Sequence, residues 1–160
     1  MSQVQKQSRV EVVVDAPVRQ VWEVISDVTR IGEWSHECHA ARWLADADEP
    51  APGVRFRGRN RAGWARWGRT CEIGTVDPPR QIVWRTVPTL LFPDSTQWCI
   101  QLEPTSDGQT LIRQSFTVLR APWLLDRLYA RLIPAHQDRD ARLAQDLARV
   151  GAAARRGTQT

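Results

Sequence analysis

The feature that most limits the possible fold is a strand that leads directly into a helix near the start of the chain. Val10, Val12 and Val14 recur at every second position, with Glu11 and Val13 between them. A two-residue period is typical of a strand with one buried face. The sequence therefore predicts that this segment lies in a half-buried sheet.

A short amphipathic helix is expected immediately afterwards. Asp15 and Ala16 offer cap positions, and Pro17 has the fixed φ that suits the first helical residue. Apolar residues then recur at i, i+3, i+4 and i+7, namely Val18, Val21, Trp22 and Ile25. Because this helix must pack its apolar face against a sheet, an α+β fold is predicted.

Further periodic segments complete the predicted sheet. A second short helix is expected at 29–34, and strands are expected at 39–45, 54–61, 65–76, 81–87, 96–102 and 112–118. The acidic, proline-containing segment 46–53 and the apolar segment 88–93 are expected to be loops. With the first strand, this gives seven strands joined as an antiparallel meander.

The C-terminal segment is predicted to be helical from near Pro122. Its apolar residues at helical spacing are Leu125, Leu128, Leu132, Leu143, Leu147 and Val150. Pro134 lies inside this pattern and is expected to kink the helix or divide it into two. Leu132, His136, Arg139 and Leu143 form one row, so His136 and Arg139 are expected on or beside the face that meets the sheet.

The run VDAPVRQVWEVISDVTRIGEWS resembles the start of proteins in the START-like (SRPBCC) superfamily, the polyketide cyclase/dehydrase and lipid-transport group. The resemblance continues through GVRFRGRNRAGWARWGRTCEI and QIVWRT to the last helix, so it covers nearly the whole chain. It implies a helix-grip fold: a curved seven-stranded antiparallel sheet around a long C-terminal helix, with two short helices after the first strand. Such folds host many unrelated activities, so the resemblance specifies fold more than function.

Length and composition favour one domain over 1–160, with a core at about 8–153. The three cysteines are odd in number and widely spaced, which favours a reduced compartment over a disulfide framework. The N-terminus has no apolar core typical of a signal peptide, and no apolar run approaches the ~20 residues of a membrane span. A cytoplasmic protein without stable membrane insertion, either a monomer or a homodimer, is expected.

The net charge of +4 depends almost entirely on arginine. Arg55, Arg57, Arg59 and Arg61 alternate along one predicted strand and so share a face. We interpret this face as the solvated outside of the sheet, and no nucleic-acid partner is expected; a basic contact stripe is the alternative.

Five polar residues are predicted to face the space between sheet and helix: Asn60, Arg69, Gln114, His136 and Arg139. A buried guanidinium is costly unless it is paired, so Arg69 should be paired or face a wet cavity. An internal ion pair to Asp138 or Asp140 and an outward-pointing Arg69 are the alternatives.

Three of the eight tryptophans, Trp67, Trp84 and Trp98, come from separate strands with the same inward phase. Large rings with a few polar groups are typical of a small-molecule pocket. A solid aromatic core is the plainer interpretation of the same pattern.

Ser35 to His39 contain two histidines and Cys38, but their spacing matches no zinc-ligand pattern. Neighbouring side chains on a strand point apart, which also argues against a Cys–His nucleophile. No phosphate-binding or nucleophile-elbow motif is present in the sequence. No metal and no cofactor are therefore expected.

The resemblance implies binding of a hydrophobic or aromatic, lipid- or polyketide-like molecule in the cavity between sheet and helix. One alternative is a polyketide cyclase/aromatase-type enzyme in which His136 and Arg69, facing each other, supply acid–base and oxyanion help. Burial and the guanidinium would then each depress the His136 pKa. A protein-interaction module is a second alternative, with the arginine face or the loop of Leu90, Leu91 and Phe92 as contact surface. The same loop could instead gate the pocket.

Overall fold

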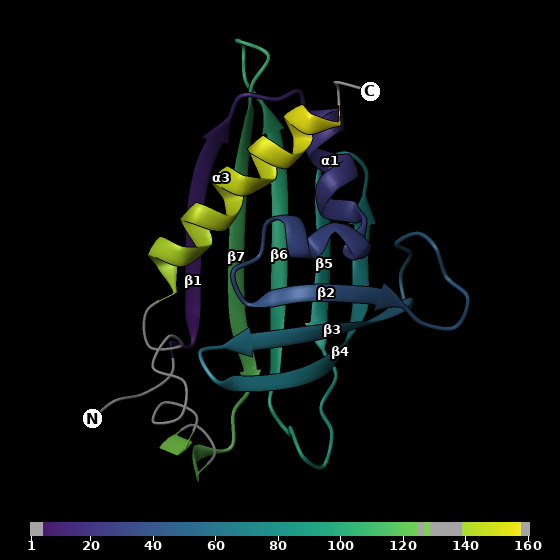
Figure 1. Cartoon of the computed structure of the whole chain (residues 1–160), viewed down its shortest axis with the longest axis vertical. Coiled ribbons are helices and arrows are strands. Elements are labelled where there is room, and N and C mark those ends of the chain that lie inside the picture. Colours follow the sequence, from purple (N-terminus) through teal and green to yellow (C-terminus); the bar gives the residue numbers. More distant parts are fainter. Residues whose placement is uncertain (1–4, 125–126, 129–138, 158–160) are drawn as a thin grey trace.

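The computed structural model describes residues 5–124, 127–128 and 139–157. Its main element is an antiparallel sheet with the strand order β1-β7-β6-β5-β4-β3-β2. The strands are β1 (Gln7–Val14), β2 (Cys38–Trp43), β3 (Arg55–Ala62), β4 (Ala65–Asp77), β5 (Gln81–Thr86), β6 (Ser95–Pro104) and β7 (Thr110–Arg120). The sheet is strongly curled: β1, β7, β6 and β5 stand upright in Figure 1, and β2, β3 and β4 cross in front of them.

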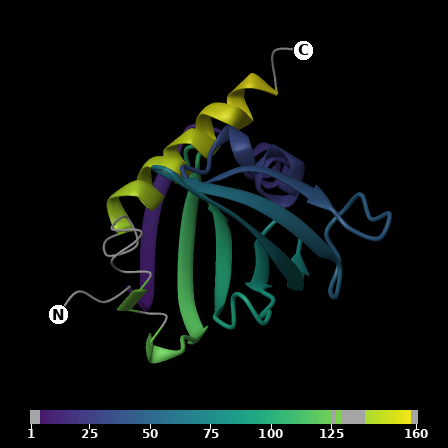
Figure 2. The same cartoon turned by 60° about the horizontal axis from the view of Figure 1, so that its bottom comes forward.

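Three helical elements cover the concave side of the sheet: α1 (Val18–Ser26), the 3₁₀ helix η1 (Val28–Glu33) and α3 (Asp140–Arg156). Helix α1 begins one residue later than expected, with Pro17 as its N-cap and no side-chain cap. The start of η1 is capped by Asp27, whose carboxylate accepts a 3.0 Å hydrogen bond from the Thr29 amide. Helix α3 packs against β1 and α1 (Figures 1 and 2).

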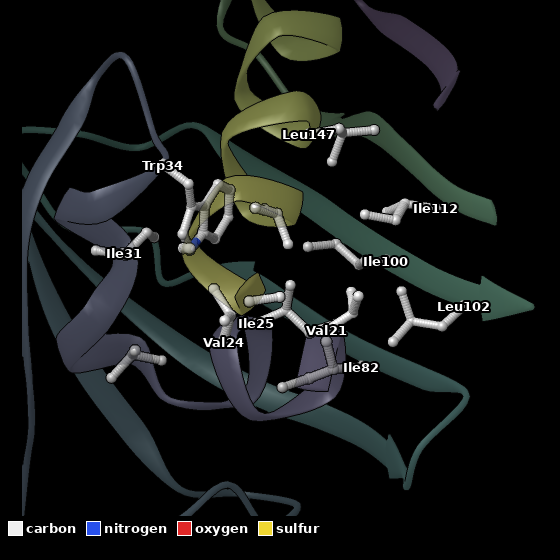
Figure 3. Packing of buried hydrophobic residues seen from close by; sticks show 14 of the residues in the cluster. Val21, Val24, Ile25, Ile31, Trp34, Ile82, Ile100, Leu102, Ile112 and Leu147 are labelled. Carbon is white, nitrogen blue, oxygen red and sulfur yellow. The ribbon is translucent and has the colours of Figure 1, made fainter. Parts of the chain in front are cut away.

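The hydrophobic core fills the upper half of the concave side. Val21 and Ile25 of α1, Ile100 and Ile112 of the sheet and Leu147 of α3 meet there (Figure 3). Gly151 permits the close approach of α3 to β1, because a Cβ at this position would lie 2.6 Å from the Cβ of Val14. Of the α1 row predicted from the sequence, Val21 and Ile25 are buried here, whereas Val18 and Trp22 are only partly buried.

The predicted α+β helix-grip architecture is confirmed, with all seven strands, both short helices and the C-terminal helix. Strand ends differ by up to three residues: ladder pairing extends β1, β6 and β7 beyond the periodic residues, whereas β2 and β5 end one or two residues earlier than predicted. The four alternating arginines of β3 are exposed on the outer face, as expected. Within the described residues, no helix is both long and apolar enough to cross a membrane.

Helix α3 begins at Asp140. The sequence predicts a helical segment from near Pro122 that Pro134 kinks or divides into two. The amide of Arg139 donates a 2.9 Å hydrogen bond to the side-chain oxygen of Gln5, so Arg139 acts as the N-cap of a new helix. Trp123, Leu124, Arg127 and Leu128 are helical upstream of this break. Pro134, and with it the predicted kink, lies outside the described residues.

Candidate functional site

A cavity of about 360 Å³ occupies the lower half of the concave side, below the hydrophobic core. It lies between the sheet, the connection from η1 to β2, and the first turns of α3. Seven of the residues that line it contribute aromatic rings: Trp34, Phe56, Trp64, Trp67, Trp84, Phe92 and Trp98. The sheet is curled so that β2, β3 and β4 cross in front of β5, β6 and β7 (Figure 1), and residues of β3, β4, β5, β6 and β7 all line the cavity.

Strand register places the central rings side by side. Trp84 of β5 pairs with Trp98 of β6, which pairs with Phe116 of β7. The ring centroids of Trp98 and Phe116 are 5.1 Å apart, and those of Phe56 and Trp84 are 6.3 Å apart with nearly perpendicular planes. These contacts hold the rings together as one wall of the cavity, and the cavity remains open beside this wall.

The described residues of the predicted site all line this cavity: Asn60, Trp67, Arg69, Trp84, Trp98, Gln114 and Arg139. Six of them come from strands, where alternate side chains share a face. Arg139 comes from the N-cap of α3. His136, together with its predicted approach to Arg69 and its pKa shift, lies outside the described residues.

Arg69 is paired with a residue that the sequence pattern did not indicate. Its Nη1 donates to both carboxylate oxygens of Asp94, at 3.1 and 2.9 Å, and its Nη2 donates to the main-chain oxygen of Asp94 at 3.0 Å. The guanidinium carbon also lies 5.3 Å from the ring centroid of Phe92. Arg69 is thus paired with Asp94, which precedes β6. The alternative partners named from the sequence are Asp138 and Asp140, of which Asp138 lies outside the described residues.

Arg139 has a different environment. Its guanidinium carbon lies 5.4 Å from the ring centroid of Phe116 and 5.9 Å from that of Trp98. The residue is 9% exposed, and its buried Nε has no hydrogen-bond partner in the described part of the chain. Burial lowers the pKa of Arg139, and the charges of Glu37 and Asp94 partly offset this shift.

Gln114 supplies a second buried polar group to the same wall. It lies on β7 between Val10 and Ile100 and is almost completely covered. Its side-chain oxygen is buried without a hydrogen-bond partner among residues 5–124, 127–128 and 139–157. Buried polar atoms are normally paired, so this amide has unused hydrogen-bonding capacity that faces the cavity.

The sequence analysis missed a histidine–aspartate pair at the cavity wall. The Nδ1 of His36 lies 2.7 Å from Oδ2 of Asp146, which is 2% exposed. Because a carboxylate only accepts, the imidazole donates its Nδ1–H, and Nε2 is left as a proton acceptor. The other oxygen of Asp146 accepts from Arg149 at 2.9 Å. The only sequence signal for Asp146 is its position three residues after Leu143, on the buried face of α3.

The cysteines are poorly suited to nucleophilic chemistry at neutral pH. Burial raises the pKa of Cys38 to about 11 and that of Cys71 to about 12. Cys38 donates to the main-chain oxygen of Ala40 and so has a structural contact of its own. Among the described residues, no three histidine, cysteine or acidic side chains converge in a group that could hold a metal ion.

Comparison with known proteins shows to which family this chain belongs. A family model described as "Polyketide cyclase / dehydrase and lipid transport" matches residues 5–148. The chain belongs to this family. The resemblance noted in the sequence is therefore confirmed. A search of the curated proteins finds no match.

Solved structures of low sequence identity share the fold of this polyketide cyclase/dehydrase and lipid-transport family member. The Zhui aromatase/cyclase from Streptomyces sp. R1128 has a TM-score of 0.69 at 20% identity, covering 97% of this chain and 96% of its own. A protein from Nitrosomonas europaea has a TM-score of 0.68 at 13% identity, covering 97% of each chain. The di-domain ARO/CYC protein StfQ of the steffimycin pathway has a TM-score of 0.66 at 15% identity, covering 95% of this chain and 46% of its own.

Proposed function

We propose that this protein binds a hydrophobic or aromatic small molecule, lipid- or polyketide-like, in the cavity between the sheet and α3. The observation that carries the proposal is the aromatic wall around a space of about 360 Å³. Small-molecule sites are typically cavities of roughly 300–1,000 Å³ with apolar walls and a few polar groups. The family and the aromatase/cyclase proteins that share the fold support the same class of ligand.

A cavity-filling substitution tests the proposal. Thr96 lines the cavity from β6, and its neighbour Gln97 is exposed on the opposite face of the same strand. Thr96→Phe is expected to fill part of the space and to weaken binding of a hydrophobic probe such as naphthalene-2-carboxamide by at least about tenfold. Gln97→Phe adds the same ring outside the cavity and is expected to leave binding unchanged.

Two measurements apply to these variants. Quenching of tryptophan fluorescence by the carboxamide should be saturable in the unmodified protein and in Gln97→Phe, because Trp84 and Trp98 line the cavity. Native mass spectrometry of protein purified from its own host should show a co-purified hydrophobic molecule that Thr96→Phe loses. Equal binding by the two variants would contradict a site in this cavity.

Catalysis of the polyketide cyclase/aromatase type is the second candidate, and the His36–Asp146 pair favours it. An imidazole held through Nδ1 by a buried carboxylate has a fixed tautomer, with Nε2 able to take a proton from a bound substrate. His36 lines the cavity, so a carbon acid bound against the aromatic wall would be within its range. Polyketide cyclisation requires proton transfer of this kind.

Hydrogen–deuterium exchange into an aromatic 1,3-diketone, followed by NMR, tests this second candidate. His36→Gln is expected to remove any acceleration of exchange over buffer. His39→Gln is the matched control, because His39 is exposed on β2. No acceleration by the unmodified protein, or equal acceleration by both variants, would leave ligand binding alone as the proposed function.

A further inference from the structure

The basic side chains that line the cavity differ in whether a carboxylate is paired with them. Arg69 is paired with Asp94, and His36 is paired with Asp146. Arg139, in contrast, has no ion pair with any residue of the described ranges, although it is 9% exposed. Of these three basic side chains, it is the most buried and the one without a carboxylate partner.

A guanidinium stays protonated under almost all conditions, so burial leaves a full positive charge in apolar surroundings. The faces of Phe116 and Trp98 compensate part of this cost through cation–π contacts at 5.4 and 5.9 Å. Ring faces attract the charge but accept no conventional hydrogen bond from the edge of the guanidinium. Among the residues that the structure describes, the Nε–H of Arg139 accordingly has no acceptor.

Two nearby carboxylates, those of Glu37 and Asp94, favour the protonated state of Arg139 through their charge, but neither forms an ion pair with its guanidinium. Asp94 already accepts two hydrogen bonds from Arg69. The charges of Glu37 and Asp94 therefore favour the protonated guanidinium, and within the described residues its Nε–H is left for another acceptor.

We infer that the cavity selects amphipathic ligands whose aromatic or hydrophobic body carries an oxyanion, and that Arg139 binds this oxyanion. The inference rests on the proposed ligand-binding function and adds the chemical class of the ligand. A carboxylate or a delocalised enolate matches the planar fork of a guanidinium and supplies the direct anionic partner that Arg139 lacks among the described residues. Trp98, which contacts both the guanidinium and the cavity, would pack against the apolar body.

The unpaired amide oxygen of Gln114 supports a polar end of the ligand at this position. Gln114 lies two residues before Phe116 on β7, so both side chains share the concave face. A hydroxyl group next to the oxyanion could donate to this oxygen. The polar end of the cavity is therefore formed by β7 and the N-cap of α3.

A matched pair of probes tests the inference. Naphthalene-2-carboxylate and naphthalene-2-carboxamide have nearly the same shape and differ in charge. The unmodified protein is expected to bind the carboxylate about 10- to 100-fold more tightly, the range of a hydrogen bond between charged groups in a buried site. Isothermal titration calorimetry at neutral pH and at two salt concentrations measures the ratio, because a buried contact is screened little by salt.

Arg139→Gln should reduce this ratio to near one while it leaves carboxamide binding unchanged. Arg66→Gln removes the same charge from the exposed rim of the cavity and should keep the ratio. Carboxamide binding also reports whether Arg139→Gln is folded, and the ratio in the unmodified protein tests the inference without any variant.

The outcomes separate the two proposals. If both probes bind with equal affinity to the unmodified protein, the inference is wrong and the proposed function stands. The same holds if Arg139→Gln keeps the preference for the carboxylate. If neither probe binds, the proposed function is overturned for ligands of this size, and the inference with it.

Discussion

Nδ1 of His36 lies 2.7 Å from Oδ2 of Asp146, and this contact joins the connection between η1 and β2 to helix α3. The two residues are 110 positions apart in the sequence. Both residues line the cavity. Its stability and its chemistry can be tested separately.

Asp146→Ala should reduce the free energy of unfolding by about 2 kcal/mol, since it removes a buried carboxylate that accepts hydrogen bonds from His36 and Arg149. Urea denaturation measures this change. Arg149→Gln is the control: that side chain is 49% exposed, and its loss should cost less than about 1 kcal/mol. Equal effects of the two substitutions would mean that the His36 contact contributes nothing.

The Arg69–Asp94 pair should show strong energetic coupling. Asp94→Ala leaves a half-buried guanidinium without its acceptor and is expected to cost about 2 kcal/mol. Arg69→Met in the Asp94→Ala background removes the unpaired charge and should restore part of this loss. A double-mutant cycle in urea measures the coupling, and additive effects would contradict it.

The loop from Pro88 to Pro93 is predicted to close over the bound ligand through Phe92. Leu90 and Leu91 are fully or largely exposed, whereas Phe92 lines the cavity and contacts Arg69. Hydrogen exchange of the Phe92 amide, which donates to the Thr89 hydroxyl, should slow when ligand binds. Phe92→Ala should weaken binding and Leu90→Ala should not; unchanged exchange would exclude a gating role.

The thiols are predicted to react with iodoacetamide in an order set by burial: Cys99 fastest, then Cys38, then Cys71. Burial raises the pKa of all three, to about 11 for Cys38 and about 12 for Cys71, and only the thiolate reacts. Mass spectrometry of the labelled peptides at pH 8 gives the order. Rapid labelling of Cys71 in folded protein would contradict its buried position.

The same shifts predict a loss of stability in alkaline solution. A thiol whose pKa is raised on folding stabilises the native state fully below the unfolded pKa of about 8.5. This contribution declines as the pH rises through the folded value of about 12 for Cys71. Urea midpoints measured from pH 8 to pH 11 should therefore fall, and Cys71→Ala should flatten the slope.

Periodicity made most of the fold predictable. The alternation around Phe56 and Gly58 fixes which face of β3 is inward, and the same argument places Trp67, Trp84 and Trp98 on the concave face. The start of α3 was not predictable in this way. The break at Arg139 depends on its hydrogen bond to Gln5, which is 134 positions away.

The sequence by itself determined the strand phases, the family and which strand side chains face the concave side of the sheet, because these follow from local alternation and from motif order. Only the tertiary structure decided the side-chain partners: Asp94 for Arg69, Asp146 for His36, and the ring faces of Trp98 and Phe116 for the guanidinium of Arg139. Side-chain pairing between distant segments depends on the curl of the sheet and on loop conformation. Neither the curl nor the loop conformation has a periodic signature in the chain.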